Sequence, residues 1–513
     1  MYLLFMIKEY VKRIEKAQVV YDVAIKTPLD PAPKLSRSLA NTVLLKREDL
    51  QPVFSFKCRG AYNCIAQLSE QQAKSGVITA SAGNHAQGVA LAAQRRGISA
   101  TIVMPKTTPN IKVTAVRHLG ATVVLIGNTY DDAFAHAMQL VEENDAVFIP
   151  PYDNEHVIAG QATVAVEILE QYPEKIDVVF VPVGGGGLLA GMTAWIKHAR
   201  PEIRIIGVEP IDAACLHDAL KAKKRVVLEQ VGIFADGVAV KQIGKEPFSV
   251  VKDYVDEVIL VSTDEICAAI MDIFDDTRAI TEPAGALAVA GLKKYVKRNN
   301  VEGECLIAVN SGANMNFDRL RHIAERAEIG EQREALLAVT VDERPGSFRD
   351  FCEIVAERGI TEFNYRYSDD NVAHVFVGVQ LADGDTERLE LIESLTSKGY
   401  PVVDMTNNEM AKIHIRYMVG GRAQGASNET LYRFEFPERP GALLRFLNNM
   451  DHGWNISLFH YRNHGAAYGR ILVGMQVPPE DHDRFQVFLD KVGYRYWRED
   501  DNPAYKLFLD SNS

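Results

Sequence analysis

"VVFVPVGGGGLLAGMTAWIKHA", residues 178–199, joins a nearly continuous apolar run to four glycines and then to a helical pattern. An apolar run without polar alternation is typical of a strand that is buried on both faces. A buried strand that leads directly into a helix is the repeating unit of parallel sheets. The stretch therefore predicts an α/β fold.

The same pattern recurs along the chain between about residues 45 and 315. Helical patterns lie between most of the short apolar runs, which cover residues 76–81, 100–105, 121–127, 146–150, 176–183, 203–210 and 305–311. This alternation predicts parallel sheets that helices cover on both faces. A length of 513 residues suggests about three domains.

The residue pattern of the sequence changes after about residue 330, where an internal repeat begins. "LLAVTVDERPGSFRDFCEIV" (336–355) aligns with "LYRFEFPERPGALLRFLNNM" (431–450), and the shared ERPG places Glu343 opposite Glu438, 95 residues later. We interpret this as a duplicated α+β unit, with chance similarity of two α+β domains as the alternative. The predicted domains are an α/β domain, 1–328, and two α+β subdomains, 332–407 and 427–503.

Composition limits the partners of the chain. The 56 Lys and Arg residues against 68 Asp and Glu residues give a formal charge of −12, which argues against nucleic acid or an anionic membrane as a partner. No apolar run approaches the ~18 residues of a membrane span, and the first 20 residues predict a helix rather than a signal peptide. Six scattered cysteines without metal-ligand spacing indicate a reduced, cytoplasmic protein, and we predict no metal site.

The four glycines, Gly184–Gly187, predict a phosphate site. Glycines let backbone N–H groups converge on an anion, and the N-terminus of the following helix adds a positive dipole. The stretch lacks the Lys–Ser/Thr pair of a nucleotide-binding P-loop. A flexible strand-to-helix turn is the alternative interpretation.

Lys57 lies within "PVFSFKCRGAYN" (52–63), among small and apolar residues. Burial lowers the pKa of an amine, and such an amine forms Schiff bases and transfers protons. A Schiff-base lysine together with a phosphate site points to pyridoxal phosphate (PLP). The neighbouring Cys58 fits an apolar packing role better than a reactive one, and Arg59 is expected to pair with a carboxylate.

Two further strand ends carry polar groups. The turn Ser81–His85, in "ITASAGNHAQGVALAAQRRG" (78–97), offers donors at a helix N-terminus that suit a carboxylate, with an N-cap role for Asn84 as the alternative. His85 is expected to orient ligand groups or to pack, rather than to act as a base. Ser311 follows the apolar run 305–311 where α/β sheets bind ligands, with helix capping as its alternative.

These motifs resemble a known family. "SFKCRGA", "SAGNHAQG", "GGGGL", "EPAGA" (282–286) and "SGANMNFDRL" resemble the threonine/serine dehydratases, which are fold-type II PLP enzymes of the tryptophan-synthase-β class. The duplicated C-terminal part resembles the regulatory half of biosynthetic threonine deaminases, with its two ACT-like subdomains. The resemblance covers nearly the whole chain.

The resemblance implies a role for each matching position. Lys57 would hold PLP covalently, Asn84 would hydrogen-bond the 3′ oxygen of the cofactor, and Ser311 would face the pyridine nitrogen. The cofactor phosphate would be wrapped by Gly184, Gly185, Gly186, Gly187 and Leu188. The substrate carboxylate would be bound by Ser81, Gly83, Asn84 and His85.

The resemblance also implies an activity, the deamination of L-threonine to 2-oxobutanoate and ammonia and of L-serine to pyruvate, as the first step towards isoleucine. Isoleucine would inhibit and valine would oppose it, with Tyr365 and Tyr461, which match in the repeat, as candidate effector residues. A homotetramer is the family expectation. Another PLP β-elimination or β-replacement enzyme, or an amino-acid-sensing protein without catalysis, is the alternative.

The sequence departs from parts of the wider family. Ala82 stands where serine-racemising members carry a second proton-transferring serine, so racemisation is disfavoured. Cys215 stands where divalent-metal members carry an acidic residue six positions after a glutamate like Glu209, so no magnesium site is predicted. Glu282 in "EPAGA" lies near the cofactor ring in one interpretation and caps a helix in the other.

Overall fold

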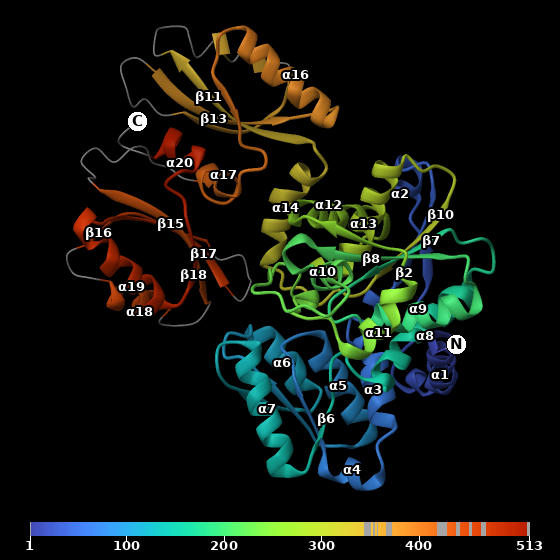
Figure 1. The fold of residues 1–513 in the computed structure, drawn as a ribbon. Helices are drawn as coiled ribbons and strands as arrows, with labels where there is room; N and C mark the ends of the chain where they lie inside the picture. Colours follow the sequence, from blue (N-terminus) through green and yellow to red (C-terminus); the bar gives the residue numbers. More distant parts are fainter. Residues whose placement is uncertain are drawn as a thin grey trace. The chain divides into compact units, whose positions relative to one another are not determined.

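The chain divides into two units, Met1–Phe317 and Asp318–Ser513, in the computed structural model (Figure 1). The structure describes residues 2–342, 350–351, 354–355, 358–365, 372–417, 428–437, 442–450, 454–462 and 468–509. Because the unit boundary follows Phe317, helix α14 (Arg319–Gly330) belongs to the second unit. The three domain ranges drawn from the sequence stay a prediction.

Two sheets form the frame of the first unit. The larger has the strand order β1-β2-β10-β7-β8-β9, and the smaller has the order β5-β4-β3-β6. The strands of the larger sheet are β1 (Leu29–Pro31), β2 (Thr42–Arg47), β7 (Val178–Pro182), β8 (Arg204–Pro210), β9 (Glu257–Val261) and β10 (Cys305–Asn310). Those of the smaller sheet are β3 (Val77–Ala80), β4 (Ala100–Met104), β5 (Thr122–Leu125) and β6 (Val147–Phe148).

The predicted parallel arrangement is confirmed for all pairs in both sheets except one. Every apolar run named from the sequence contains a strand, and these strands pair in parallel with their neighbours. Strand β1 is the exception, because it pairs with β2 in antiparallel register at the edge of the larger sheet. Strands β1, β2 and β9 have no counterpart among the predicted runs.

Helices cover both faces of each sheet, as expected (Figure 1). In the smaller sheet, Ile102 packs with helix α5 while its neighbour Val103 packs with α7, as period-two alternation requires. The helices are α1 (Tyr2–Lys16), α2 (Pro33–Ser38), α3 (Lys57–Ala66), α4 (Glu70–Ser75), α5 (Asn84–Arg96), α6 (Asn110–His118), α7 (Tyr130–Asn144), α8 (Glu155–Gln171), α9 (Gly187–Ala199), α10 (Cys215–Ala222), α11 (Lys245–Tyr254), α12 (Thr263–Thr277) and α13 (Pro283–Asn299). Short 3-10 turns include η2 (Glu48–Leu50) and η4 (Asp236–Val238).

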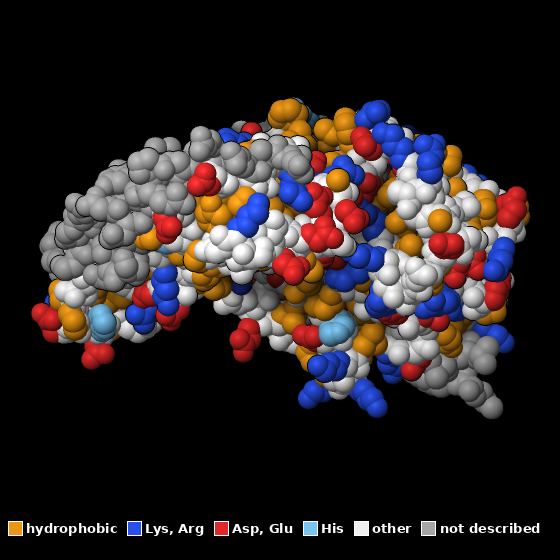
Figure 2. Space-filling model, turned by 90° about the horizontal axis from the view of Figure 1, so that it is seen from above, with side chains coloured by type: hydrophobic (Ala, Val, Ile, Leu, Met, Phe, Trp, Pro, Cys, Tyr) orange, Lys and Arg blue, Asp and Glu red, His pale blue; other side chains and the backbone are white. Residues whose placement is uncertain are grey.

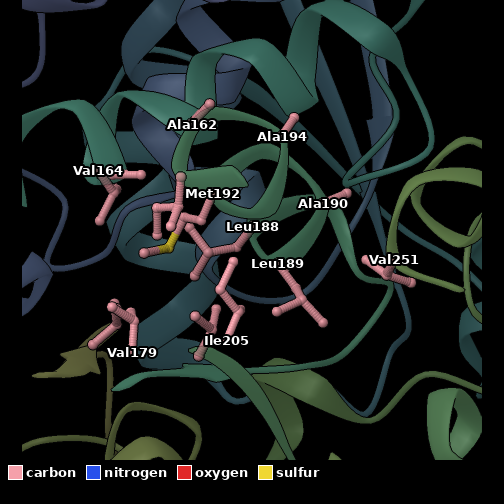
Figure 3. Packing of buried hydrophobic residues seen from close by; sticks show 14 of the residues in the cluster. Ala162, Val164, Val179, Leu188, Leu189, Ala190, Met192, Ala194, Ile205 and Val251 are labelled. Carbon is pink, nitrogen blue, oxygen red and sulfur yellow. The ribbon is translucent and has the colours of Figure 1, made fainter. Parts of the chain in front are cut away.

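Helix α9, which begins at the glycine stretch, is held against the larger sheet by its apolar side chains. Figure 3 shows Leu188, Leu189 and Met192 of α9 packed among side chains of β7, β8 and α8. Full burial of each such side chain contributes roughly 1.5–3 kcal/mol. The N-terminus of α9 is therefore fixed relative to the strand ends of the sheet.

The second unit contains two four-stranded antiparallel sheets, with the orders β12-β13-β11-β14 and β16-β17-β15-β18. Their strands are β11 (Glu334–Asp342), β12 (Ile360–Tyr365), β13 (Val372–Gln380), β14 (Val402–Asp404), β15 (Glu429–Pro437), β16 (Asn455–Arg462), β17 (Tyr468–Gln476) and β18 (Arg495–Arg498). The helices, besides α14, are α16 (Gly384–Ser397), α17 (Glu409–Ile413), α18 (Ala442–Asn449), α19 (His482–Val492) and α20 (Pro503–Phe508).

The two sheets repeat one another residue by residue, as the duplication predicts. Glu334 opposes Gln380 at the end of β11, and Glu429 opposes Gln476 at the end of β15. The second strand of each repeat also carries a register shift at the same place, after Ile360 in β12 and after Ile456 in β16. A shared strand order, register and bulge indicate a duplication rather than chance similarity.

The candidate effector residues occupy equivalent backbone positions. Tyr365 pairs with Val375, and Tyr461 pairs with Ile471. These two pairs stand at the same register position in the two repeats. The side chains of both tyrosines and the two ERPG turns lie outside the described residues. Their role in effector binding stays a prediction.

The surface carries charges of both signs. On the face shown in Figure 2, acidic and basic side chains of the described residues lie interspersed among apolar ones. No helix in the described ranges is long and apolar enough to cross a bilayer.

Candidate active site

Lys57 is the first residue of helix α3, and backbone pairing holds it just beyond the end of β10. The N–H of Phe56 donates to the carbonyl of Ser311 at 3.3 Å, and the N–H of Ala313 donates to the carbonyl of Phe54 at 2.8 Å. Phe54 has φ of +54°, a left-handed conformation that is uncommon for a bulky residue and costs roughly 1–3 kcal/mol. The pairing therefore imposes the turn that presents Lys57.

The amine of Lys57 is in a desolvated environment. Its Nζ donates to the carbonyl of Pro151 at 3.1 Å. The side chain keeps some solvent access, but its amine lies deep enough for desolvation to lower its pKa from 10.5 to about 8, an effect that the Glu282 carboxylate opposes. An appreciable neutral fraction near neutral pH makes this amine a nucleophile and a base.

Glycines let two helices approach the start of α3. A Cβ built on Gly88 of α5 would lie 3.0 Å from the carbonyl oxygen of Lys57. A Cβ built on Gly160 of α8 would lie 2.6 Å from the carbonyl oxygen of Arg59. The backbone around Lys57 is thus packed between two helices.

A buried ion cluster fixes the next turn of α3. Arg59 is fully buried and forms hydrogen bonds to two fully buried carboxylates, Glu48 at 2.8 Å and Glu167 at 2.6 Å. Lys46 donates to Glu167 at 2.6 Å from the neighbouring strand β2. The expectation that Arg59 pairs with a carboxylate is confirmed, with two partners instead of one.

The glycine stretch forms a tight loop between β7 and α9. Gly186 is the N-cap of α9 and has φ of +89°, which favours glycine. A Cβ on Gly185 would lie 2.1 Å from Cγ of Tyr152, and a Cβ on Gly184 would lie 2.9 Å from Cα of Val238. Tyr152 and Val238 therefore pack directly on the loop, and a side chain at either glycine would displace them.

The carbonyl groups of the loop show where its N–H groups point. The Gly184 carbonyl accepts from Sγ of Cys215 at 3.4 Å, and the Gly185 carbonyl accepts from the N–H of Gly244 at 3.1 Å. In a planar trans peptide the next N–H points the opposite way. The N–H groups of Gly185 and Gly186 are thus directed away from Cys215 and Gly244. The first-turn N–H groups of α9 have no acceptor within the helix, so both sets of donors can serve an anion.

The turn Ser81–His85 links β3 to α5. The N–H of Ser81 donates to the carbonyl of Val103 at 3.1 Å, and the N–H of Gly83 contacts Oγ of Ser81 at 3.4 Å. Gly83 is the N-cap of α5, and Asn84 is its first residue. The N-cap interpretation of Asn84 is therefore wrong.

The Asn84 side chain is held at both ends of its amide. Its Nδ2 donates to Oε1 of Glu282 at 2.5 Å, and its Oδ1 accepts from Nδ2 of Asn314 at 2.7 Å. Because a carboxylate only accepts, this pattern fixes the orientation of the amide. One hydrogen on Nδ2 is left to donate to a ligand.

His85 is buried and neutral. Its Nε2 lies 2.9 Å from the carbonyl of Ile149, so Nε2 carries the hydrogen. Desolvation and the charge of Lys57 lower the pKa of His85 to about 3, while the Ile149 carbonyl opposes the shift. A neutral histidine in this position packs and orients the turn.

Ser311 follows β10 and is buried. Its Oγ donates to the carbonyl of Ala284, in the first turn of α13, at 3.3 Å. This contact is not an N-cap, because a cap hydroxyl accepts from a helix N–H. Glu282 is the N-cap residue of α13, yet its side chain makes no capping bond and contacts Asn84 instead.

Four of the predicted residues, Lys57, Gly184, Gly185 and Ser311, lie along one closed ring of contacts. Adjacent members are chain neighbours, hydrogen-bond partners or atoms that a Cβ would touch, in the order Gly184, Val238, Gly237, Glu282, Gly312, Ser311, Phe56, Lys57, Pro151, Tyr152 and Gly185. Asn84 joins the ring through Glu282. The structure thus brings together residues that lie as far apart in sequence as Lys57 and Ser311.

Several ring members, among them Tyr152, Gly237 and Val238, were not predicted from the sequence. Tyr152 and the turn Asp236–Val238 enclose the glycine loop but carry no motif. Glu282 was singled out, but its contact with Asn84 spans 198 positions.

Glu209 lies outside the ring and is buried beneath the start of α10. Its carboxylate accepts from the N–H groups of Leu216 and His217, each at 2.8 Å. Desolvation raises the pKa of Glu209 to about 7, although these hydrogen bonds oppose the shift. Among the described residues, no group of three or more His, Cys, Asp or Glu side chains is arranged to hold a metal ion.

The two sheets, the desolvated lysine and the glycine loop define the class as PLP-dependent enzymes with parallel sheets. A family model described as "Pyridoxal-phosphate dependent enzyme" matches residues 20–312. A second model, "C-terminal regulatory domain of Threonine dehydratase", matches twice, at 325–415 and 420–509.

Full-length relatives narrow this class. A "L-threonine dehydratase biosynthetic IlvA" of Burkholderia multivorans is 55% identical over 98% of this chain and 99% of its own length. The Escherichia coli protein of that name is 52% identical over 98% and 97%. The "Threonine dehydratase, mitochondrial" of Saccharomyces cerevisiae is 50% identical over 98% and 89%. The chain belongs to the threonine dehydratase family.

Solved structures agree with this assignment. The processed form of threonine deaminase isoform 2 from Solanum lycopersicum has a TM-score of 0.61 and 48% identity, and it covers 63% of this chain and 93% of that one. Maize serine racemase has a TM-score of 0.58 and 33% identity, and it covers 61% and 95%. The fold of the matching part is therefore shared with a protein whose name describes a different reaction.

Proposed function

We propose that this protein deaminates L-threonine to 2-oxobutanoate and ammonia, and L-serine to pyruvate, with PLP as its cofactor. The observation that carries the proposal is the Lys57 amine, whose pKa is lowered to about 8 and which lies on one ring of contacts with the glycine loop, Asn84 and Ser311. The family of the chain narrows the substrate to threonine.

The residues present fit the cofactor. The glycine loop offers N–H groups that can bind the cofactor phosphate, and Asn84 retains one donor hydrogen for the cofactor. Ser311 supplies a neutral hydroxyl, and not a carboxylate, for the pyridine nitrogen. PLP supplies an aldehyde for the amine and an electron-withdrawing ring that acidifies the Cα–H bond of the amino acid.

Each residue then has a definable task. With the cofactor bound, the free amine of Lys57 would remove the α-proton of the substrate at Nζ. Ser311 would be the residue at the pyridine nitrogen, and its neutral hydroxyl would not support the full charge that a carboxylate would, which would favour early loss of the β-hydroxyl over transamination. The turn Ser81–His85 binds the substrate carboxylate and so fixes the face from which Lys57 acts.

The same geometry disfavours racemisation. Ala82 lies in the turn between Ser81 and Gly83, where a proton-transferring side chain would be required on the opposite face of the substrate. A methyl group cannot transfer a proton. Serine should therefore be eliminated to pyruvate and not inverted.

The second unit is proposed to carry regulation. Isoleucine would inhibit, valine would oppose it, and Tyr365 and Tyr461 at equivalent register positions would contribute to their sites. Isoleucine and valine differ by one methylene, which limits discrimination to about 1–3 kcal/mol. A homotetramer in the cytoplasm completes the proposal.

The test is the rate of 2-oxobutanoate release from L-threonine by the purified holoenzyme, with and without isoleucine. Release that isoleucine suppresses supports both the catalytic and the regulatory proposal. Lys57→Ala should retain some PLP but lose turnover by orders of magnitude, and near-normal turnover in that variant would exclude the mechanism. No release by PLP-loaded enzyme would favour another β-elimination or β-replacement substrate, and failure to bind PLP would favour an amino-acid sensor.

A further inference from the structure

Glu282 is a buried carboxylate whose position is fixed from two directions. Its side chain accepts from Nδ2 of Asn84 at 2.5 Å, and its own N–H donates to the carbonyl of Gly312 at 3.1 Å. Only 3% of Glu282 is exposed. The residue thus connects the first turn of α5, next to the smaller sheet, with the end of β10 in the larger sheet.

Two glycines close over the Glu282 carboxylate. A Cβ on Gly312 would lie 2.7 Å from its Oε1, and a Cβ on Gly237 would lie 3.4 Å from the same atom. The backbone can approach the carboxylate this closely because neither position has a side chain. An oxygen enclosed in this way cannot relax towards solvent, so its charge acts inside the site.

Glu282 and Lys57 lie on the same ring of contacts, and the charge of the Glu282 carboxylate affects the Lys57 amine. The carboxylate raises the pKa of Lys57 against the larger, opposite effect of desolvation. Helix capping does not account for the side chain, because it makes no capping bond to α13. Its Oε1 is instead bound to Asn84, whose other amide end is held by Asn314.

From this geometry we propose that Glu282 is a positioning residue of the active site with two separable effects. Its carboxylate holds the Asn84 amide so that the remaining Nδ2 hydrogen is directed at the cofactor ring, and its negative charge balances the Lys57 ammonium. The proposal rests on the proposed PLP function, and it adds the residue that joins the two sheets at the cofactor.

The two effects separate in two variants. Glu282→Gln keeps an oxygen that accepts from Asn84 but removes the charge, whereas Glu282→Ala removes both. Glu265→Gln is the matched control, because it removes one carboxylate charge from the N-terminal turn of α12, where Glu265 accepts from Ser262. Circular dichroism of each variant establishes that it is folded.

The charge effect is measured on Lys57 in the apo-protein. Reductive methylation of Lys57 by formaldehyde and borohydride, followed by peptide mass spectrometry across pH, gives the midpoint at which the amine becomes reactive. Glu282→Gln should lower this midpoint by at least about one pH unit, as expected for the loss of an opposite charge nearby. A midpoint within 0.3 unit of wild type, with Glu265→Gln also unchanged, would overturn the charge effect.

The positioning effect is measured by PLP titration of the apo-protein, read from the absorbance of the lysine-bound cofactor. We expect Glu282→Ala to weaken PLP binding about tenfold or more and Glu282→Gln to weaken it less than threefold. In an Asn84→Ala background, Glu282→Ala should have no further effect, and full additivity of the two changes would overturn the positioning role. If Glu282→Ala does not fold, Glu282→Met, which fills most of the volume but has no oxygen to accept from Asn84, replaces it in the same comparison.

These readouts do not depend on turnover. If wild-type holoenzyme releases no 2-oxobutanoate while the pH midpoint and the PLP titration respond as expected, only the proposed reaction fails. If threonine is deaminated but neither quantity responds to Glu282, only the role of Glu282 fails.

Discussion

Replacing Arg59 by methionine should destabilise the first unit strongly, because Arg59 compensates two buried charges at once. It donates to Glu48 from Nε and Nη2, both at 2.8 Å, and to Glu167 from Nη1 at 2.6 Å. Both carboxylates are fully buried. Methionine fills much of the volume but leaves the carboxylates without these donors.

The two carboxylates differ in the hydrogen-bond partners that remain after Arg59 is replaced. Glu167 retains the ammonium of Lys46 at 2.6 Å, whereas the remaining side-chain hydrogen bonds found for Glu48 in the described structure come from Thr27 and Gln51. Removing one partner of a buried pair typically costs 3–5 kcal/mol. We therefore expect Arg59→Met to lower the free energy of unfolding by about 3–5 kcal/mol, mostly through Glu48.

The pH dependence of the stability loss in Arg59→Met supplies a second test. Arg59 holds the pKa of Glu48 below its usual range although desolvation alone would raise it. In Arg59→Met desolvation would be opposed only by the weaker effects of Lys46 and Thr27 and would raise that pKa. The folded state would then bind a proton that the unfolded state has released, and stability would rise as pH falls through the raised value. The loss relative to wild type should therefore be smaller at pH 5 than at pH 8.

Urea unfolding of the apo-protein at pH 5 and pH 8 measures these differences in the free energy of unfolding. The unfolding transition of the first unit is the one to be monitored. Glu48→Gln added to Arg59→Met should restore about half of the lost stability, because it neutralises the stranded carboxylate. Glu265→Gln combined with Arg59→Met is the matched control. A loss below 1 kcal/mol, or strict additivity of Glu48→Gln and Arg59→Met, would refute the reasoning.

Three further predictions concern the cofactor site and its regulation. Gly185→Ala should weaken PLP binding at least tenfold in a cofactor titration, because its Cβ would lie 2.1 Å from the Tyr152 ring, and Tyr152→Ala should partly rescue it; equal affinity of Gly185→Ala and wild type would contradict the packing. The rate at which apo-protein captures PLP should rise with pH with a midpoint near 8 and level off above about pH 9, because deprotonation of Lys57 is nearly complete one unit above its lowered pKa; a rise that continued with a midpoint near pH 10 would indicate an unperturbed amine. Tyr365→Phe and Tyr461→Phe should each raise the isoleucine concentration for half-inhibition about two- to tenfold, the value of one lost hydrogen bond, without changing turnover in its absence; unchanged inhibition would remove these tyrosines from the effector sites.

The sequence allowed the strands of the first unit to be predicted wherever they are apolar throughout. Strand β2 was not predicted, because "TVLLKR" ends in Lys46 and Arg47 and is therefore not an apolar run. Both charges are buried with acidic partners, Lys46 against Glu167 and Arg47 against Asp49. The partner of Lys46 comes from α8, 121 positions away, so no local pattern could reveal that this charge is interior.

Motifs located Lys57, the glycine loop and the Asn84 turn because each consists of neighbouring residues at a strand-to-helix joint. Side chains that touch those motifs from elsewhere had no such signal. Tyr152 packs on Gly185 through chain folding alone, and the partner of Asn84 proved to be Glu282, not the backbone of its own helix. Long-range contacts of this kind depend on how two sheets meet, which residue spacing does not encode.

The Glu282–Asn84 contact indicates how small a change in free energy is sufficient to control the activity of such a site. Tenfold inhibition corresponds to about 1.4 kcal/mol, and a hydrogen bond to a charged group contributes roughly 1.5–3 kcal/mol. This single contact joins groups that belong to the two sheets of the first unit. Weakening it would therefore be sufficient, in free energy, to change activity tenfold without any rearrangement of the core of either sheet. A site that distinguishes two ligands differing by one methylene, as proposed for isoleucine and valine, has about 1–3 kcal/mol available, which is the same order of free energy.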